Sequence, residues 1–193
     1  MRDSGTARSL ARRVAVFLDR DGTLIEDAHY LSSPDGVQLL PGAPEAVAAL
    51  NAAGVLSIVV TNQSGIAQGL VTEAEYRATR DRLDQLLAER GARVDATYHC
   101  PHHPSVSGAC ECRKPSAGMY RRAALDLDID LTRSLYVGDR RRDVEPALEL
   151  GGRGVLVPST VTPPNDIAWA RAHAEVEHSL GDVVSGFLAR RVD

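Results

Sequence analysis

Short apolar runs alternate along this chain with longer segments in which apolar residues recur at helical spacing. Residues 14–18 form an apolar run that stops at an acidic, glycine-containing turn, and residues 55–60 form a second run rich in β-branched side chains. Runs of this kind are typical of strands buried on both faces of a parallel sheet. Three more strands are predicted at 97–98, 135–137 and 155–157, and the last of these is expected to be the last strand of the core.

Helices are predicted between these strands. Residues 44–53 precede Gly54, a residue type that commonly ends helices, and Thr72 with Glu75 forms a capping-box pattern before a helix that ends at Gly91. Further helices are predicted at 119–127 and 144–150, and two weakly amphipathic segments follow at 167–174 and 180–190. The alternation predicts an α/β fold, a Rossmann-like parallel sheet with helices on both faces. Ligands of such sheets bind at the carboxyl ends of the strands.

The length of 193 residues and the lack of an obvious linker predict a single domain over residues 1–193, with a flexible tail at 1–13. Asp21 and Thr61 are not separated by a large insertion, and neither are Thr61 and Lys114. We therefore expect no large cap domain over the site.

Composition narrows the classes of function. Aromatic residues make up 4% and the net charge is -4, which argues against a nucleic-acid partner. The one tight basic cluster, residues 140–142, fits either phosphate contact or a solvated helix start. The longest apolar stretch is far too short to span a bilayer and the first residues lack an apolar segment, so we expect no membrane partner and a cytoplasmic location. A monomer is expected.

The most informative segment is the turn after the first predicted strand. It places two carboxylates, Asp19 and Asp21, two positions apart, and Gly22 lets the chain turn sharply. Aspartate and glycine are also common in ordinary turns, so this segment alone is ambiguous. Three later segments fall where the fold would bring them to the same edge: 61–62, Lys114 and 138–139.

Together the segments DRDGT, TNQSG, CRKP and VGDRRRD resemble the four motifs of the haloacid dehalogenase superfamily of aspartate-nucleophile phosphatases, and the similarity spans about residues 14–157. The resemblance implies that Asp19 attacks phosphorus and forms an aspartyl-phosphate. It implies that Asp21 protonates the leaving oxygen and then takes a proton from the attacking water. Thr61 and Lys114 would donate hydrogen bonds to the phosphate oxygens.

Clustered acids that face a phosphate need a cation, and hard oxygen ligands favour Mg²⁺. The ligands are expected to be Asp19, Asp139 and the carbonyl of Asp21. Asp143 has two open interpretations. It would either order the waters of the metal or begin the next helix near that helix's positive end.

Three cysteines and a histidine occur close together in the irregular segment 100–115. A closed set of this kind suits tetrahedral zinc, with the ligands Cys100, His102, Cys110 and Cys112. His99 and His103 compete for the histidine position, but the Cys-x-His spacing favours His102. Three free buried thiols are the alternative, and they would leave the order of the loop unexplained. We expect the zinc to be structural and to fix the residues that follow it, Arg113 and Lys114.

A zinc loop inside such a phosphatase resembles two groups, the D-glycero-D-manno-heptose 1,7-bisphosphate 7-phosphatases and the histidinol-phosphate phosphatases. Residues 27–30, 61–73 and 100–104 are more similar to the heptose group. This resemblance implies a phosphorylated sugar as substrate and hydrolysis of its 7-phosphate. The substrate contacts that it implies are Asp27, Ala28, His29, Tyr30, Asn62, Gln63, Ser64, Arg113 and Arg140.

Two departures from the heptose group concern substrate choice. The stretch 103–109 between zinc ligands is short, and Gln68 stands where that group often has arginine. Histidinol-phosphate phosphatase is therefore the nearest alternative. A non-catalytic, metal-stabilised binding protein is an alternative from another class, but the intact Asp19, Asp21, Lys114 and Asp139 argue against it.

Overall fold

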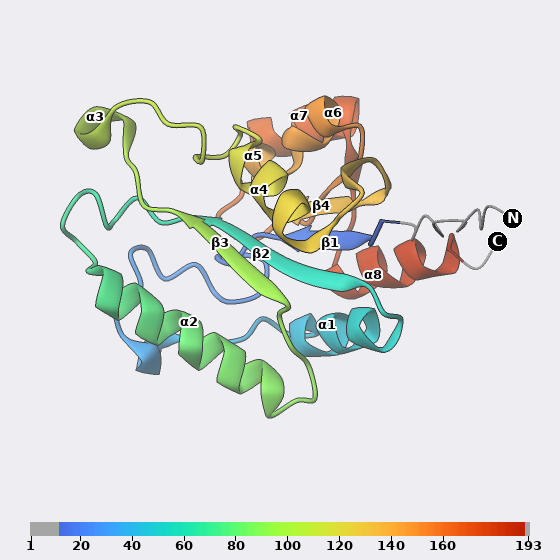
Figure 1. Ribbon diagram of the computed structural model, residues 1–193, viewed down its shortest axis with the longest axis horizontal. Coiled ribbons are helices and arrows are strands. Elements are labelled where there is room, and N and C mark those ends of the chain that lie inside the picture. Colours follow the sequence, from blue (N-terminus) through green and yellow to red (C-terminus); the bar gives the residue numbers. More distant parts are fainter. Residues whose placement is uncertain (1–11, 192–193) are drawn as a thin grey trace, which may run out of the picture.

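A computed structural model describes residues 12–191 of the chain. Its centre is one six-stranded sheet, in the order β3-β2-β1-β4-β5-β6, and every neighbouring pair is parallel (Figure 1). The strands are β1 (Ala15–Leu18), β2 (Leu56–Asn62), β3 (Ala96–Cys100), β4 (Leu135–Gly138), β5 (Arg153–Leu156) and β6 (Glu175–Val176). This strand order is that of the doubly wound α/β fold, so the predicted fold class is confirmed.

Helices cover both faces of the sheet (Figure 1). One face carries α1 (Ala43–Ala52), α2 (Glu73–Ala88) and α8 (Leu180–Ala189). The other carries α4 (Gly118–Leu127), α5 (Arg141–Val144), α6 (Pro146–Leu150) and α7 (Pro164–His173). Single turns lie at η1 (Pro34–Gly36), α3 (Pro104–Ser107) and η2 (Leu131–Arg133). Within residues 12–191, the segment between β1 and β2 adds only η1 and α1, so no cap domain is inserted there.

The central strand β1 divides the core into two layers because its side chains alternate between the faces. Val16 and Leu18 pack in a cluster with residues of α1, α2 and α8. Phe17 packs on the other side, edge to face with Tyr120 and stacked on Tyr136, with ring centroids 5.1 Å apart in both pairs. Burial on both faces explains why the first strand has an unbroken apolar sequence.

The sheet has one short strand beyond the segment 155–157, which was predicted to be the last core strand. This edge strand, β6, has only two half-buried residues and pairs with β5 through Val155 and Leu156. Arg153 and Glu175 reinforce this pairing with an ion pair of 2.8 Å. A strand of two residues shows no alternation that a sequence pattern could reveal.

The remaining differences are local. The predicted helix at 144–150 is two short helices, with Pro146 at the first position of the second, where proline is tolerated. The predicted loop at 100–115 contains the single turn α3. Of the predicted tail, residues 1–11 lie outside the described part, while Arg13 forms a β-bridge with Ile129. Between residues 12 and 191 no helix has the length and apolar character needed to cross a bilayer.

Candidate active site

Three neighbouring strands deliver polar side chains to one edge of the sheet. Asp19 follows β1, Asp139 follows β4, and Thr61 is the penultimate residue of β2. The strand order reverses at β1, which has β2 on one side and β4 on the other. The backbone N–H of Asp19 also donates to the carbonyl of Val137 at 2.9 Å, which fixes the turn after β1 to β4. The site therefore lies at the position where ligands of doubly wound sheets bind.

Lys114 reaches this edge from the loop before α4, and its ammonium group is fully enclosed. Its Nζ lies 2.8 Å from Oδ1 of Asp19 and 2.7 Å from Oδ1 of Asp143, and it donates to the carbonyl of Val60 at 2.6 Å. Burial alone would lower the pKa of Lys114, but the Asp143 and Asp19 carboxylates outweigh it and raise that pKa. Lys114 is therefore a charged group that faces Asp19.

Asp19, Asp139 and Asp143 form a buried cluster in which one carboxylate oxygen of each lies within 4.8 Å of the others. Burial, with the nearby charge of Asp19, raises the pKa of Asp143 to about 6. The hydroxyl of Ser159, which the sequence analysis did not identify, donates to Oδ2 of Asp139 at 2.6 Å. Buried carboxylate oxygens are the donors that Mg²⁺ prefers, so the donor set fits that ion.

Asp143 lies in the first turn of α5, as predicted by the interpretation that it begins this helix. Its Oδ2 accepts a hydrogen bond of 3.0 Å from the backbone N–H of Arg140, and it is the third residue of α5. Its other oxygen faces Lys114. The second interpretation, ordering the waters of a metal, stays a prediction.

Gly22 allows the turn after β1 to pass close to Asp139. Its φ is +81°, and a Cβ on it would lie 2.6 Å from Oδ2 of Asp139. Gly54 has a similar φ of +68°, but a Cβ on Gly54 would have no atom within 4 Å.

We expect Gly54→Ala to lower the free energy of unfolding by roughly 1–2 kcal/mol, the cost of a left-handed L-residue. Gly22→Ala should lower it further in denaturant titrations, and equal losses would contradict the close approach.

Asp21 faces a cavity of about 350 Å³ beside this cluster, and both of its carboxylate oxygens accept hydrogen bonds. The donors are Arg20, whose Nη2 lies 2.8 Å from Oδ1, and Gln63, whose Nε2 lies 2.9 Å from Oδ2. Arg20 stands between the two aspartates in the sequence and is 2% exposed. No role in the site was predicted for Arg20, although its place between the two aspartates of the motif is a signal in the sequence.

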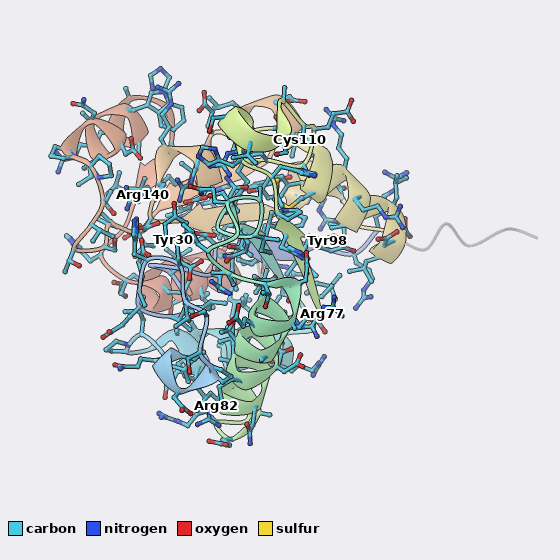
Figure 2. All side chains as sticks on the ribbon, turned by 90° about the vertical axis from the view of Figure 1, so that its left-hand side faces the viewer. Tyr30, Arg77, Arg82, Tyr98, Cys110 and Arg140 are labelled. Carbon is cyan, nitrogen blue, oxygen red and sulfur yellow. The ribbon has the colours of Figure 1, made fainter. Side chains whose placement is uncertain are left out.

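The cavity gathers most of the predicted substrate contacts. Those that line it are Asp27, His29, Tyr30, Asn62, Gln63, Ser64, Arg113 and Arg140. Ala28 is exposed and does not line it. Figure 2 shows Tyr30 and Arg140 beside each other on this side of the molecule. Arg20 and His103 also line the cavity and had not been predicted to do so, and so does Arg142, which belongs to the basic cluster 140–142. Arginine dominates the charged lining, which suits an anionic ligand.

The loop that carries His29 and Tyr30 holds both residues in a left-handed conformation, with φ of 46° and 63°. Non-glycine residues in this conformation cost roughly 1–2 kcal/mol each. Two contacts hold the loop. The ring of Tyr30 packs so closely on Gly65 that a Cβ there would lie 2.6 Å from the ring, and Gln68 donates to the Tyr30 hydroxyl at 3.2 Å. Gln68 thus fixes Tyr30 without adding a charge to the cavity.

Asn62 and Arg113 connect the cavity to neighbouring segments. The Asn62 side chain makes two hydrogen bonds with the backbone of Lys114, donating to its carbonyl at 3.1 Å and accepting from its N–H at 3.0 Å. The guanidinium of Arg113 donates to the carbonyl of His102 at 3.1 Å. The segment 102–114 is therefore tied to the end of β2.

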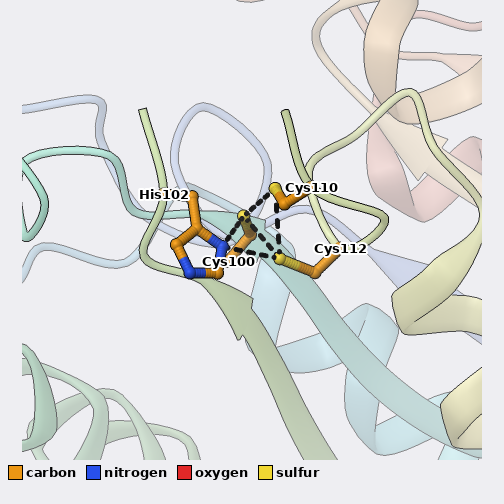
Figure 3. Close-up of side chains that lie close together, drawn as sticks. All are labelled: Cys100, His102, Cys110 and Cys112. Carbon is orange, nitrogen blue, oxygen red and sulfur yellow. Dashed lines mark hydrogen bonds between the residues drawn. The ribbon is translucent and has the colours of Figure 1, made fainter. Parts of the chain in front are cut away.

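Cys100, His102, Cys110 and Cys112 meet in one cluster (Figure 3). The sulfur of Cys100 lies 3.7 Å from that of Cys110 and 2.9 Å from that of Cys112, and Nδ1 of His102 lies 3.1 Å from the sulfur of Cys112. Three thiols and an imidazole whose ligand atoms all lie within 4.8 Å of one another are a donor set that suits tetrahedral zinc. The two competing histidines lie outside this cluster. Nδ1 of His103 is hydrogen-bonded to the hydroxyl of Ser105, and Nε2 of His99 lies 3.3 Å from Oε1 of Glu73.

The fold and these motifs together define the class of HAD-like hydrolases. A family model described as HAD-hydrolase-like matches residues 111–183, which include Lys114, Asp139 and Asp143.

The D-glycero-beta-D-manno-heptose-1,7-bisphosphate 7-phosphatase of Yersinia pestis is 43% identical over 149 residues, which cover 74% of this chain and 79% of that protein. The same enzyme of Escherichia coli K12 is 39% identical over 179 residues, covering 88% and 91%. The crystal structure of the D,D-heptose 1,7-bisphosphate phosphatase of B. bronchiseptica, complexed with magnesium and phosphate, is 36% identical with a TM-score of 0.83, covering 92% of this chain and 99% of that chain. The chain therefore belongs to the family of heptose bisphosphate phosphatases.

Proposed function

We propose that the protein hydrolyses the 7-phosphate of D-glycero-D-manno-heptose 1,7-bisphosphate. The observation that carries this proposal is the buried Asp19 carboxylate beside Lys114, together with Asp21, two positions further on, which lines a cavity rich in arginine. The similar enzymes of Yersinia pestis and Escherichia coli K12 are named as 7-phosphatases of that sugar bisphosphate, and they match the chain over most of its length. A sugar that carries two phosphates needs cationic contacts away from the reacting one, and Arg113 and Arg140, which line the cavity, would supply them.

Asp19 would be the nucleophile. An oxygen of its carboxylate bonds to phosphorus while the bond from phosphorus to the sugar oxygen breaks, and Asp21 gives its proton to that leaving oxygen. Asp21 then takes a proton from the water that attacks the aspartyl-phosphate, which restores Asp19 and releases phosphate. Lys114 and Thr61 would donate to the phosphate oxygens, where charge is spread in the transition state.

Two metal ions complete this proposal. Mg²⁺ would be held by Asp19, Asp139 and the carbonyl of Asp21, and it would neutralise charge on the transferring phosphate. Zinc would be held by Cys100, His102, Cys110 and Cys112. Its role would be structural, because all four positions are filled by protein atoms. The hydrogen bond from Arg113 to the carbonyl of zinc ligand His102 would then let the zinc cluster fix the position of Arg113 in the cavity.

Substrate choice is tested by direct competition between the two phosphate esters that the sequence suggests. We expect purified protein with Mg²⁺ to show a higher kcat/KM for heptose 1,7-bisphosphate than for histidinol phosphate, because the cavity arginines have no second phosphate to bind in histidinol phosphate. Phosphate release from both anomers of the sugar, and from histidinol phosphate, measures this. Equal or better turnover of histidinol phosphate would overturn the substrate assignment and leave the phosphatase chemistry standing. No release from any ester would favour the non-catalytic alternative.

The expected cytoplasmic location and monomeric state are parts of the same proposal. The cluster of cysteines supports the location, since zinc-binding thiols must stay reduced.

A further inference from the structure

The side chain of Arg20 lies beneath the Asp21 carboxylate and is 3% exposed, against 22% for Asp21. Its Nε lies 3.1 Å from each of the two Asp21 oxygens, and its Nη2 lies 2.8 Å from Oδ1. A planar guanidinium that contacts both oxygens fixes the plane of a carboxylate as well as its position. Asp21 is therefore held in one orientation toward the cavity.

Every polar group of the Gln63 side chain forms a hydrogen bond with Arg20, Asp21 or Thr61. Its carbonyl oxygen accepts from Nη2 of Arg20 at 3.1 Å. Its amide nitrogen donates to Oδ2 of Asp21 at 2.9 Å and to Oγ1 of Thr61 at 2.8 Å. An amide group has two N–H donors, so both bonds form at once. In this structure both N–H groups of Gln63 are therefore directed at Asp21 and Thr61.

Arg20 is itself fixed from helix α2. Its Nη1 lies 3.4 Å from Oγ1 of Thr79, and its guanidinium carbon lies 5.6 Å from the centre of the Tyr76 ring. Both residues are buried on the inner face of α2. A buried arginine that has hydrogen-bonding partners and an aromatic ring on one side is held rigidly.

We propose that Arg20 and Gln63 are positioning residues that orient the two proton-donating groups of the reaction. Together they direct the Asp21 carboxylate at the leaving oxygen. Gln63 also donates to the oxygen of Thr61, which leaves the hydrogen of the Thr61 hydroxyl for the phosphate. This inference rests on the proposed function, and it gives Gln63 a role other than the sugar contact that the family resemblance implies.

The test compares leaving groups in substrates that lack the sugar. Gln63→Met removes both donors without adding a charge, and Arg20→Lys keeps the charge but cannot contact both Asp21 oxygens. On heptose bisphosphate we expect Gln63→Met to lower kcat by about 10²-fold, the scale of acid-base catalysis, with little change in KM. On aryl phosphates both variants should lose more turnover of phenyl phosphate than of p-nitrophenyl phosphate, because phenolate leaves less readily without a proton. Gln85→Met, on the exposed side of α2, is the matched control.

Two outcomes would overturn the inference. An increase in KM for heptose bisphosphate, with both aryl phosphates unaffected, would identify Gln63 as a sugar contact. Equal losses on the two aryl phosphates would show that the orientation of the acid is not involved. Thermal unfolding of each variant separates these results from a loss of folded protein, and Gln63, which is only partly buried, is the safer site. Wild-type protein that cleaves the aryl phosphates but not the sugar bisphosphate would refute the proposed substrate, and the aryl pair would still test the positioning.

Discussion

Asp19→Asn is expected to abolish hydrolysis of heptose bisphosphate while the protein stays folded. The carboxylate oxygen of Asp19 is the atom proposed to bond to phosphorus, and an amide is a poor nucleophile and a weaker Mg²⁺ ligand. Removal of a nucleophile in other enzymes lowers kcat by about 10⁴-fold or more, and we expect a loss on that scale. Phosphate release under saturating substrate measures it.

The fold should tolerate this substitution. Lys114 keeps its contact with Asp143 at 2.7 Å when the charge of Asp19 is removed, so the buried ammonium group is not left without a counter-charge. Circular dichroism and zinc content should match the wild type. Asp35→Asn, which changes an exposed carboxylate at η1, should keep full activity. Substantial activity of the Asp19→Asn protein would refute the nucleophile assignment.

Cys110→Ser is expected to remove zinc and stability together. Structural zinc couples its binding free energy to folding, so loss of one of four ligands weakens both. Each kcal/mol lost shifts the Tm of a domain this size by about 2–4 °C, and we expect a decrease of roughly 10 °C. Metal analysis of the purified protein and a thermal melt measure the two effects.

Glu111→Gln is the matched control for this substitution, because Glu111 is exposed and lies between the two cysteines. It should keep wild-type zinc and Tm. Turnover in Cys110→Ser should also fall, since Arg113 is bonded to the carbonyl of His102 and the same segment carries Lys114. Unchanged zinc content would show that the cluster of Figure 3 does not bind this metal.

Residues that follow buried strands were predictable from sequence. Asp19, Thr61 and Asp139 come after apolar runs, and the parallel topology places the ends of such runs at one edge. The cluster of Cys100, His102, Cys110 and Cys112 was also predictable, because its members are close in sequence and their types suit one ion.

Contacts that depend on tertiary packing were not predictable. Lys114 lies 95 positions from Asp19, and nothing in the local sequence indicates that its ammonium group would also face Asp143. The roles of Arg20 and Gln63 depend on side-chain directions that the surrounding core determines. The pairing of β6 depends on its neighbour β5 and not on its own two residues.

The central position of β1 has a consequence for the order in which this protein matures on the ribosome. Ala15 of β1 donates its N–H to the hydroxyl of Ser134, which precedes β4, and 119 positions separate the two residues. Asp19 is thus synthesised well before β4, which lies beside β1, and before Asp139. Domains of this topology cannot gain their long-range contacts until both partners exist. A nascent chain therefore carries Asp19 without the strand that completes the site until β4 has been synthesised, and the proposed hydrolysis would begin only when β4 joins the sheet.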